Sequence, residues 1–380
     1  MSNTKRFRTK QMINNRVHPK GKSFIVGLDV GYSGTKVFYE GGFLCFPSYA
    51  KKIEGMLGVF DQNDIIYRED ETGDMYMVGY NAQNMMESSN TNDTEGELFA
   101  RNRYSNKMFR ILCNTAIGLA QQYKRPNQKI VVQTGLPSSY VSRDTTALQK
   151  AISAGGSFSL KVGNQNWVKC MVNVKPEDVY VMPQPAGALY SVLIKNDGNY
   201  IGEAKKMLLS NILVIDIGFG TFDFYGIKNR EVVCTDSIDD IGMKEVLRRT
   251  SKKIMKEYGE EVRIGSMQKN LVSGTVTCIN EDDMTTEEKQ IGPLLFASSE
   301  EVMQDALIKA KNVTNAFRDY NYIIVDGGTG EAWYENIKDW LKNMKTIKIL
   351  PCNINDTSLP FIFANARGYY MFRYMQDRRG

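Results

Sequence analysis

Histidine is almost absent from this chain of 380 residues, because His18 is its only example. Its place in the polar N-terminal stretch argues against a histidine general base and against a histidine metal site. The six cysteines are scattered without a CxxC pair, so they indicate neither a zinc site nor a disulfide framework. We therefore expect reduced thiols, and any chemistry must use carboxylates, amides and backbone groups.

Long apolar runs are also missing from the sequence. No stretch reaches the roughly 20 apolar residues that a membrane-spanning helix needs. The first 22 residues lack the apolar core of a signal peptide, so we expect a cytoplasmic protein with no membrane contact. Because 42% of the residues are apolar, the chain has enough material for two packed domains.

Acidic residues are missing from positions 1–22, which hold seven of the 48 basic residues. These seven are Lys5, Arg6, Arg8, Lys10, Arg16, Lys20 and Lys22. The rest of the chain carries a small net negative charge, so a basic face for DNA on the folded body is poorly supported. We predict that residues 1–22 form a disordered tail that catalysis does not require. A direct DNA contact is expected only if this tail supplies it.

The apolar pattern after the tail predicts an α/β fold. Three short strands separated by glycine turns are predicted at residues 24–31, 34–41 and 42–46. A similar strand, turn and strand recur at 212–218 and 221–227, which indicates two related domains. Other predicted elements are strands at 129–132, 158–160, 168–174, 179–182 and 322–325, helices at 98–123, 139–153, 184–193, 242–258, 300–317 and 361–375, and an exposed loop at 85–96.

The first turn carries a motif with the residue types of a phosphate site. Its members are Asp29, Val30, Gly31, Tyr32, Ser33, Gly34, Thr35 and Lys36. The glycines let the backbone approach a phosphate chain, and the amides and hydroxyls can donate hydrogen bonds to it. Asp29, at the end of a buried strand, can hold magnesium, and Lys36 adds a positive charge. Taken alone, the motif is equally compatible with an ordinary hairpin turn.

Two further glycine motifs follow buried strands. The second comprises Asp216, Ile217, Gly218, Phe219, Gly220, Thr221, Phe222 and Asp223, and the third comprises Asp326, Gly327, Gly328, Thr329 and Gly330. Two facing hairpins can clamp a nucleotide's phosphates, with Asp29 and Asp216 flanking one metal ion. The third motif allows close backbone contact with a purine or a ribose. Three such motifs in this order are a strong signal for nucleotide binding.

The three motifs resemble the phosphate 1, phosphate 2 and adenosine motifs of the actin, heat-shock chaperone and sugar kinase superfamily. Residues 180–190 (YVMPQPAGALY) resemble the segment that positions the attacking water in actin and ParM, which places Gln184 in that role. Residues 132–140 (VQTGLPSSY) and 363–369 (FANARGY) are similar to segments of the ParM family. Two departures are the basic tail and Phe219, which stands where the chaperones have glycine.

The resemblance implies an actin-like ATPase with a nucleotide cleft between two related domains. It implies ATP and ADP with Mg²⁺ as ligands, Gln184, Asp216 and Asp29 as catalytic residues, and assembly with further copies of the chain into filaments. It also implies plasmid segregation through an adaptor protein on a centromere-like site. The expected divisions are 1–22 for the tail, 23–185 for domain I, 186–360 for domain II and 361–380 for a helix that returns to domain I.

Two alternatives from the same superfamily stay open. A small-molecule kinase needs a carboxylate base near its substrate, whereas Gln184 is an amide that can orient water but cannot accept a proton as a base. A chaperone or cell-division type of ATPase would act as a binding module. The chain is too short for an appended peptide-binding domain, and no amphipathic membrane helix is evident at either end.

Overall fold

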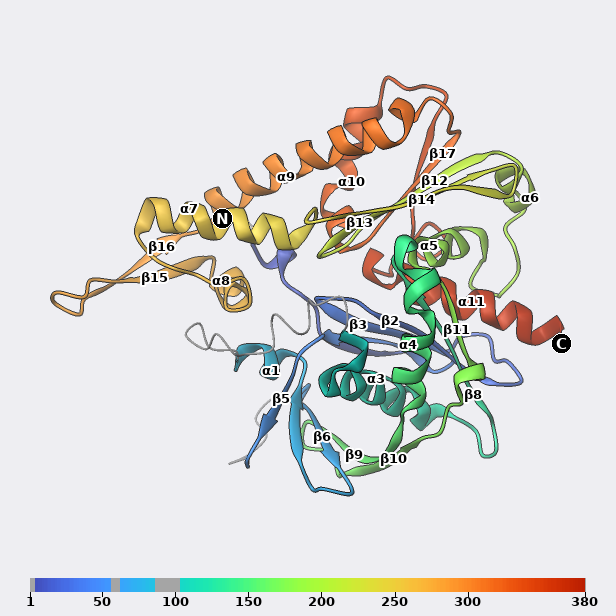
Figure 1. Cartoon of the computed structure of the whole chain (residues 1–380), viewed down its shortest axis with the longest axis horizontal. Helices are drawn as coiled ribbons and strands as arrows, with labels where there is room; N and C mark the ends of the chain where they lie inside the picture. Colours follow the sequence, from blue (N-terminus) through green and yellow to red (C-terminus); the bar gives the residue numbers. More distant parts are fainter. Residues whose placement is uncertain (1–3, 56–61, 86–102, 380) are drawn as a thin grey trace.

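Two β-sheets face each other across a layer of helices (Figure 1). The computed structural model describes residues 4–55, 62–85 and 103–379. The first sheet has the strand order β1-β4-β3-β2-β8-β11, and the second has the order β14-β13-β12-β17-β18. In each sheet a central strand, β2 or β12, pairs antiparallel with the next strand and parallel with a later one. The predicted repeat is therefore confirmed as two related α/β domains.

Domain I contains the first sheet and a smaller outer sheet of order β10-β9-β6-β7-β5. Its strands are β1 (Met12–Asn15), β2 (Phe24–Val30), β3 (Gly34–Tyr39), β4 (Gly42–Pro47), β5 (Ala50–Ile53), β6 (Ile65–Glu69), β7 (Met75–Val78), β8 (Ile130–Leu136), β9 (Gly156–Val162), β10 (Val168–Val172) and β11 (Val179–Pro183). Its helices are α1 (Tyr80–Asn84), α3 (Lys107–Ala120) and α4 (Val141–Ser153).

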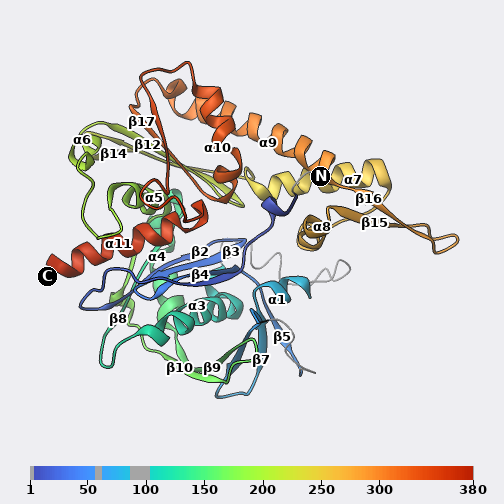
Figure 2. The same cartoon turned by 180° about the vertical axis from the view of Figure 1, so that it is seen from behind.

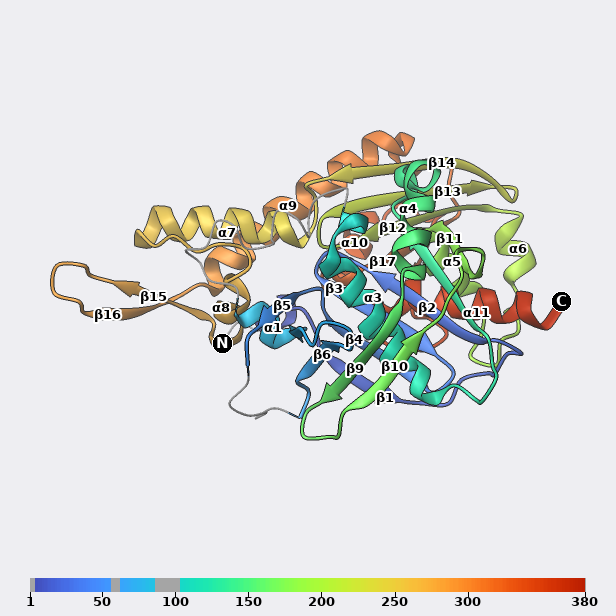
Figure 3. The same cartoon turned by 60° about the horizontal axis from the view of Figure 1, so that its bottom comes forward.

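Domain II contains the second sheet and a two-stranded hairpin that projects from the body (Figures 1 and 3). Its strands are β12 (Asn211–Ile217), β13 (Thr221–Lys228), β14 (Glu231–Asp239), β15 (Thr275–Ile279), β16 (Thr286–Gln290), β17 (Tyr322–Asp326) and β18 (Lys348–Pro351). Its helices are α6 (Ala204–Leu208), α7 (Met243–Tyr258), α8 (Met267–Ser273), α9 (Gly292–Val313) and α10 (Gly328–Leu341). Strands β15 and β16 form the projecting hairpin.

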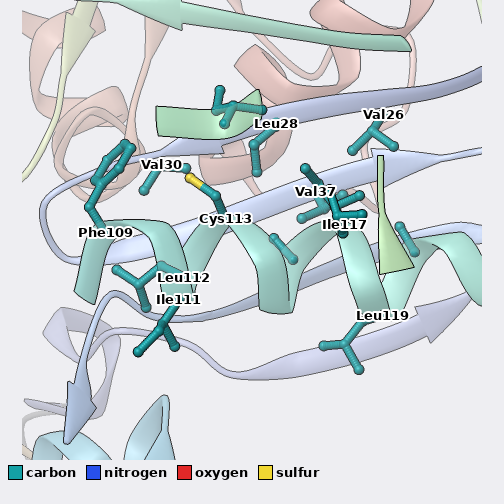
Figure 4. Close-up of a cluster of buried hydrophobic side chains, with 14 of the residues drawn as sticks. Val26, Leu28, Val30, Val37, Phe109, Ile111, Leu112, Cys113, Ile117 and Leu119 are labelled. Atoms are coloured by element: carbon teal, nitrogen blue, oxygen red, sulfur yellow. The ribbon is translucent and has the colours of Figure 1, made fainter. Parts of the chain in front are cut away.

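The outer face of the first sheet packs on α3. Alternate residues of β2 point to this face, and Val26, Leu28 and Val30 meet Phe109 and Ile117 of the helix (Figure 4). All five side chains are buried. Because successive strand residues face opposite sides, Ile25, Gly27 and Asp29 of β2 face domain II.

A second apolar cluster, here called the shared layer, fills the space between the two sheets. It contains Ile25 and Phe38 from the first sheet and Ile212 and Val214 from the second. Helices α5 (Gln184–Leu193) and α11 (Ala364–Arg379) run through this layer, and α11 packs against β2, β3 and β8. Apolar burial in the shared layer therefore stabilises both domains at once.

Glycines let the elements of the shared layer approach closely. A Cβ atom on Gly368 of α11 would lie 1.7 Å from the carbonyl oxygen of Gly187 in α5. A Cβ atom on Gly27 of β2 would lie 2.2 Å from the carbonyl oxygen of Ala366. These contacts involve backbone atoms, so a larger residue at either position forces whole elements apart.

The N-terminal segment, defined as residues 4–22, is not the disordered tail that its composition suggested. Strand β1 pairs antiparallel with β4, from Met12 opposite Cys45 to Asn15 opposite Gly42. His18 is buried and its ring lies 4.0 Å from that of Phe38. The prediction of a disordered tail is wrong, because the backbone hydrogen bonds of β1 and the burial of side chains such as His18 stabilise this segment despite its polar composition.

The other predicted helices and strands that fall on described residues are present, with differences in where they begin and end. Helix α9 begins at Gly292, earlier than the predicted start at 300, because Pro293 is tolerated in the first helical turn. Residues 86–96 of the predicted loop and 98–102 of the predicted helix lie outside the described residues. Within the described ranges, no helix is long and apolar enough to cross a membrane.

Substitution of Gly368 tests the contact between α5 and α11. We expect Gly368→Ala to lower the free energy of unfolding by about 3 kcal/mol, because the new methyl group collides with backbone rather than with a movable side chain. Gly202→Ala is the matched control, since a Cβ atom at that position would have no atom within 4 Å. Urea unfolding measures the free energy of unfolding of both variants. Equal values for Gly368→Ala and Gly202→Ala would contradict the contact between α5 and α11.

The burial of His18 predicts a pH dependence of stability. Burial, helped by the charges of Arg16 and Arg367, lowers the pKa of His18 from 6.5 to about 3. The unfolded chain therefore binds a proton more readily than the folded one below pH 6.5, so stability falls as the pH decreases from 6.5 towards 3. Between pH 7 and pH 5 this contribution amounts to at most about 2 kcal/mol.

The comparison of wild type with His18→Gln isolates this contribution from the carboxylates, which titrate in both proteins. We expect the wild type to lose more stability than the variant between pH 7 and pH 5, measured by urea unfolding at each pH. Parallel pH profiles of the two proteins would show that His18 is accessible to protons in the folded state.

Candidate functional site

Strand alternation turns two aspartates toward the same space between the domains. Asp29 lies on the face of β2 that also carries Ile25 of the shared layer. Asp216 lies on the face of β12 that carries Ile212 and Val214. On both strands the face toward the shared layer is apolar up to these positions and carries the aspartate near the end of the strand.

The two predicted hairpin turns have the same backbone geometry and touch each other. The amide of Gly31 donates to the carbonyl of Gly34 at 3.0 Å, and the amide of Gly218 donates to the carbonyl of Thr221 at 3.0 Å. A Cβ atom on Gly220 would lie 3.2 Å from the ring of Tyr32. The first and second motifs therefore face each other across a short distance.

A cavity lies at this junction and contains about 1190 Å³ of space, including its open mouth. Every predicted site residue except one lines it, namely Asp29, Gly31, Tyr32, Ser33, Gly34, Lys36, Gln184, Asp216, Gly218, Phe219, Gly220, Thr221, Gly327, Gly328 and Thr329.

Thr35 is the exception among the predicted ligand contacts. Its side chain is fully buried, and its hydroxyl lies 3.0 Å from that of Ser48. Thr35 shares the face of β3 with Val37 and Tyr39, which pack in the core of domain I, whereas its neighbours Gly34 and Lys36 face the cavity. We therefore remove Thr35 from the set of ligand contacts.

Asp29 holds two of the predicted residues in place. The ammonium of Lys36 donates to Asp29 Oδ2 at 3.1 Å, and the side-chain amide of Gln184 donates to Asp29 Oδ1 at 3.2 Å. Lys36 stands directly opposite Asp29 in the β2–β3 ladder, whereas Gln184 is the first residue of α5. The three side chains form one hydrogen-bonded group on the cavity wall.

Three carboxylates lie side by side across the second sheet. Asp216 is in register with Asp223 on one neighbouring strand and with Asp326 on the other. Burial raises the pKa of Asp216 to about 6 and that of Asp223 to about 7, and the charges of Asp29 and Asp216 respectively add to the effect. Burial, with the charge of Asp216, also raises the pKa of Asp326. A site with this much buried negative charge favours a cation.

The third motif completes the wall at the start of α10. Gly327 has φ = 86°, and a Cβ atom on it would lie 2.3 Å from the carbonyl oxygen of Ile217, so only glycine fits there. The hydroxyl of Thr329 donates to the carbonyl of Gly218 at 2.7 Å and ties this motif to the second one. The N-terminus of α10 thereby faces the cavity, where its free amides favour an anion.

Several cavity residues were missed by the sequence analysis. Asn365 donates to Asp216 Oδ2 at 2.8 Å and accepts from the amide of Ala188, so it links α11, α5 and β12. Its segment resembles the ParM family, but the resemblance assigns no role to Asn365. Arg103 stacks over Tyr32 at 4.5 Å, and no local motif marks it. Residues 6–10 of the N-terminal segment also line the cavity.

Comparison with known proteins supports this description. Residues 27–187 match the family model "Actin like proteins N terminal domain". A search of curated proteins finds no significant match.

Solved structures resemble the chain over nearly all of its length. A non-polymerisable quadruple mutant of pCBH ParM shares 20% identity, covers 93% of this chain and 99% of its own, and has a TM-score of 0.72. A 15-stranded ParM filament from Clostridium botulinum also shares 20% identity with the same coverage and a TM-score of 0.69. The archaeal actin homologue Ta0583, in complex with ADP, shares 19% identity, covers 94% of this chain and 100% of its own, and has a TM-score of 0.60.

The two related domains, the paired glycine turns and the similar solved structures define an actin-like fold for this chain. The two ParM structures share this fold along 93% of the chain.

Proposed function

We propose that this protein binds ATP with Mg²⁺ in the cavity between its domains and hydrolyses it. The observation that carries the proposal is the meeting of two equivalent glycine turns with Asp29 and Asp216 in one cavity. The turns offer backbone amides to phosphates, and Lys36 and the start of α10 add positive charge. The ADP complex of Ta0583, which has the same fold, supports nucleotide as the ligand.

The carboxylates of the cavity fit a magnesium ion. Among the described residues, no group of three or more histidine, cysteine or acidic side chains is arranged to hold a metal alone. Magnesium needs few protein carboxylates, because it keeps several waters and binds phosphate oxygens. Asp29 and Asp216 are the residues that would hold it, directly or through water. The bound ion would neutralise phosphate charge during transfer.

Gln184 is the proposed orienting residue for the attacking water. Its amide nitrogen donates to Asp29, so its carbonyl oxygen is free to accept from a water molecule. An amide cannot act as a base, which disfavours transfer of the phosphoryl group to a sugar or an acid. Incubation with ATP and candidate sugars separates these reactions, because a kinase would form a phosphorylated sugar and a hydrolase only free phosphate.

We further propose that ATP binding favours assembly into filaments and that hydrolysis weakens them. Two of the structures with the same fold are described as a ParM filament and as a non-polymerisable ParM mutant. By analogy with ParM, the filament would move plasmid DNA in the cytoplasm through an adaptor on a centromere-like site. Electron microscopy of the purified protein with ATP and with ADP tests the assembly step.

Removal of the Asp216 carboxylate tests the assignment of the metal site. We expect Asp216→Ala to reduce magnesium-dependent phosphate release by at least about 100-fold, because the ion that neutralises the transferring phosphoryl group loses a partner. Asp236→Asn, an exposed acid on β14, is the matched control and should retain wild-type turnover. Near-normal turnover in Asp216→Ala would overturn the assignment.

The stability of Asp216→Ala provides a second check. Burial raises the pKa of Asp216, so its charged form disfavours the folded state at neutral pH. Loss of the hydrogen bond from Asn365 opposes this gain, so we expect the melting temperature without nucleotide to stay close to that of the wild type. If Asp216→Ala loses ATP hydrolysis while its melting temperature is unchanged, the loss is due to the catalytic site and not to unfolding.

Gln184→Ala separates nucleotide binding from hydrolysis. We expect this variant to bind ATP and assemble, because the glycine turns supply most of the nucleotide contacts, while phosphate release slows by at least about tenfold. Its filaments should outlast wild-type filaments under the same limiting ATP. Sedimentation over time, with phosphate release measured in parallel, checks both effects, and exposed Gln304→Ala serves as the control. Slow phosphate release without longer-lived filaments would refute the coupling.

A further inference from the structure

The N-terminal segment crosses the cavity from domain II to domain I. In Figure 2 the start of the chain lies beside α7 and α8 of domain II and then runs to the first sheet. Phe7 is buried in the core of domain II, where its ring meets that of Phe296 edge-on at 5.6 Å. The hydroxyl of Thr4 donates to the carbonyl of Leu271 at 2.9 Å. These contacts anchor the segment to domain II.

A second anchor holds the segment to domain I a few residues later. The amide of Tyr80 donates to the side chain of Gln11 at 2.8 Å, and β1 continues the first sheet from Met12. The hydroxyl of Tyr80 donates to the carbonyl of Thr9 at 2.7 Å.

Only Arg8, Thr9 and Lys10 lie between the two anchors. Three extended residues span about 10 Å, so this bridge has little freedom to move while both ends are docked. The amide of Thr9 donates to Gln268 of α8, and its hydroxyl donates to Gln83 of α1. The middle of the bridge is therefore bonded to both domains, and its two cationic neighbours are held at the cavity wall.

The cations of the bridge retain unused hydrogen-bonding capacity. The guanidinium carbon of Arg8 lies over the Tyr80 ring, 3.9 Å from its centre, and among the described residues the Nε atom of Arg8 is buried without a hydrogen-bond partner. Lys10 forms a long ion pair with Glu331, at 3.8 Å. A guanidinium that stacks on a ring can still donate hydrogen bonds from its edge to two oxygens of a phosphate. The ammonium of a lysine, on its flexible side chain, can reach the same phosphate.

We propose that Arg8 and Lys10 contact the phosphates of the bound nucleotide, so that the N-terminal segment is a phosphate-binding element separate from the three glycine motifs. This inference rests on the proposed nucleotide function. Both residues share the cavity with Lys36 and with the glycine turns. Because the bridge is anchored in both domains, its cations are pre-positioned and lose little conformational freedom on binding.

Nucleotide affinity of the full-length protein tests the proposal. We expect Arg8→Gln and Lys10→Gln each to weaken binding of ATP with Mg²⁺ by about tenfold in calorimetric titrations, since a charge-assisted contact to phosphate is lost. Lys5→Gln is the matched control, because Lys5 is an exposed cation of the same segment that does not line the cavity. Adenosine, which has no phosphate, should bind all four proteins equally.

The outcomes separate this inference from the proposed function. Absence of ATP binding by the wild type would overturn the nucleotide assignment itself. Wild-type ATP affinity in both substituted proteins would overturn only the role of the bridge. An equal loss for ATP and adenosine would show that the substitutions merely undock the segment and would likewise reject phosphate contact. Hydrogen exchange of residues 4–22 confirms docking in each variant, and Arg8→Lys should restore part of the affinity.

Discussion

The backbone contact between α5 and α11 determines how far apart the two sheets lie. Because Gly187 and Gly368 have no side chains, the helices cross at a distance that no other residue pair permits at this point. The sheets on either side are then close enough for Asp29 and Asp216 to reach one cavity. The arrangement of the site therefore depends on packing in the shared layer, where apolar side chains surround the contact between α5 and α11.

The sequence predicted those parts of the fold and site whose signals are local. Buried strands that end in Asp and glycine marked both halves of the cleft, and strand alternation explains why Asp29 and Asp216 face it. Thr35 was assigned wrongly because the motif was treated as a unit, although alternate residues of a strand face opposite sides. Arg103 lies far from any glycine turn in sequence, so only the tertiary structure brings it to the cavity.

The N-terminal segment was the largest error, and its cause is also physical. A high basic content favours disorder when a segment has no partner, but it does not reveal a partner more than 200 residues away. Phe7 finds its place beside Phe296, and Arg16 beside Asp356. Such contacts form only once the chain has folded, and the pattern of residues that are close in sequence does not predict them.

The position of α11 also affects how the protein can fold during its synthesis. This helix covers β2 and β8, yet it follows domain II in the sequence, so about 180 residues separate it from the last strand of the sheet that it covers. At about 5–20 residues per second, a ribosome leaves that apolar face open for roughly 10 to 40 seconds. One face of the first sheet therefore stays uncovered until domain II has been made, although the face that packs on α3 can be buried earlier.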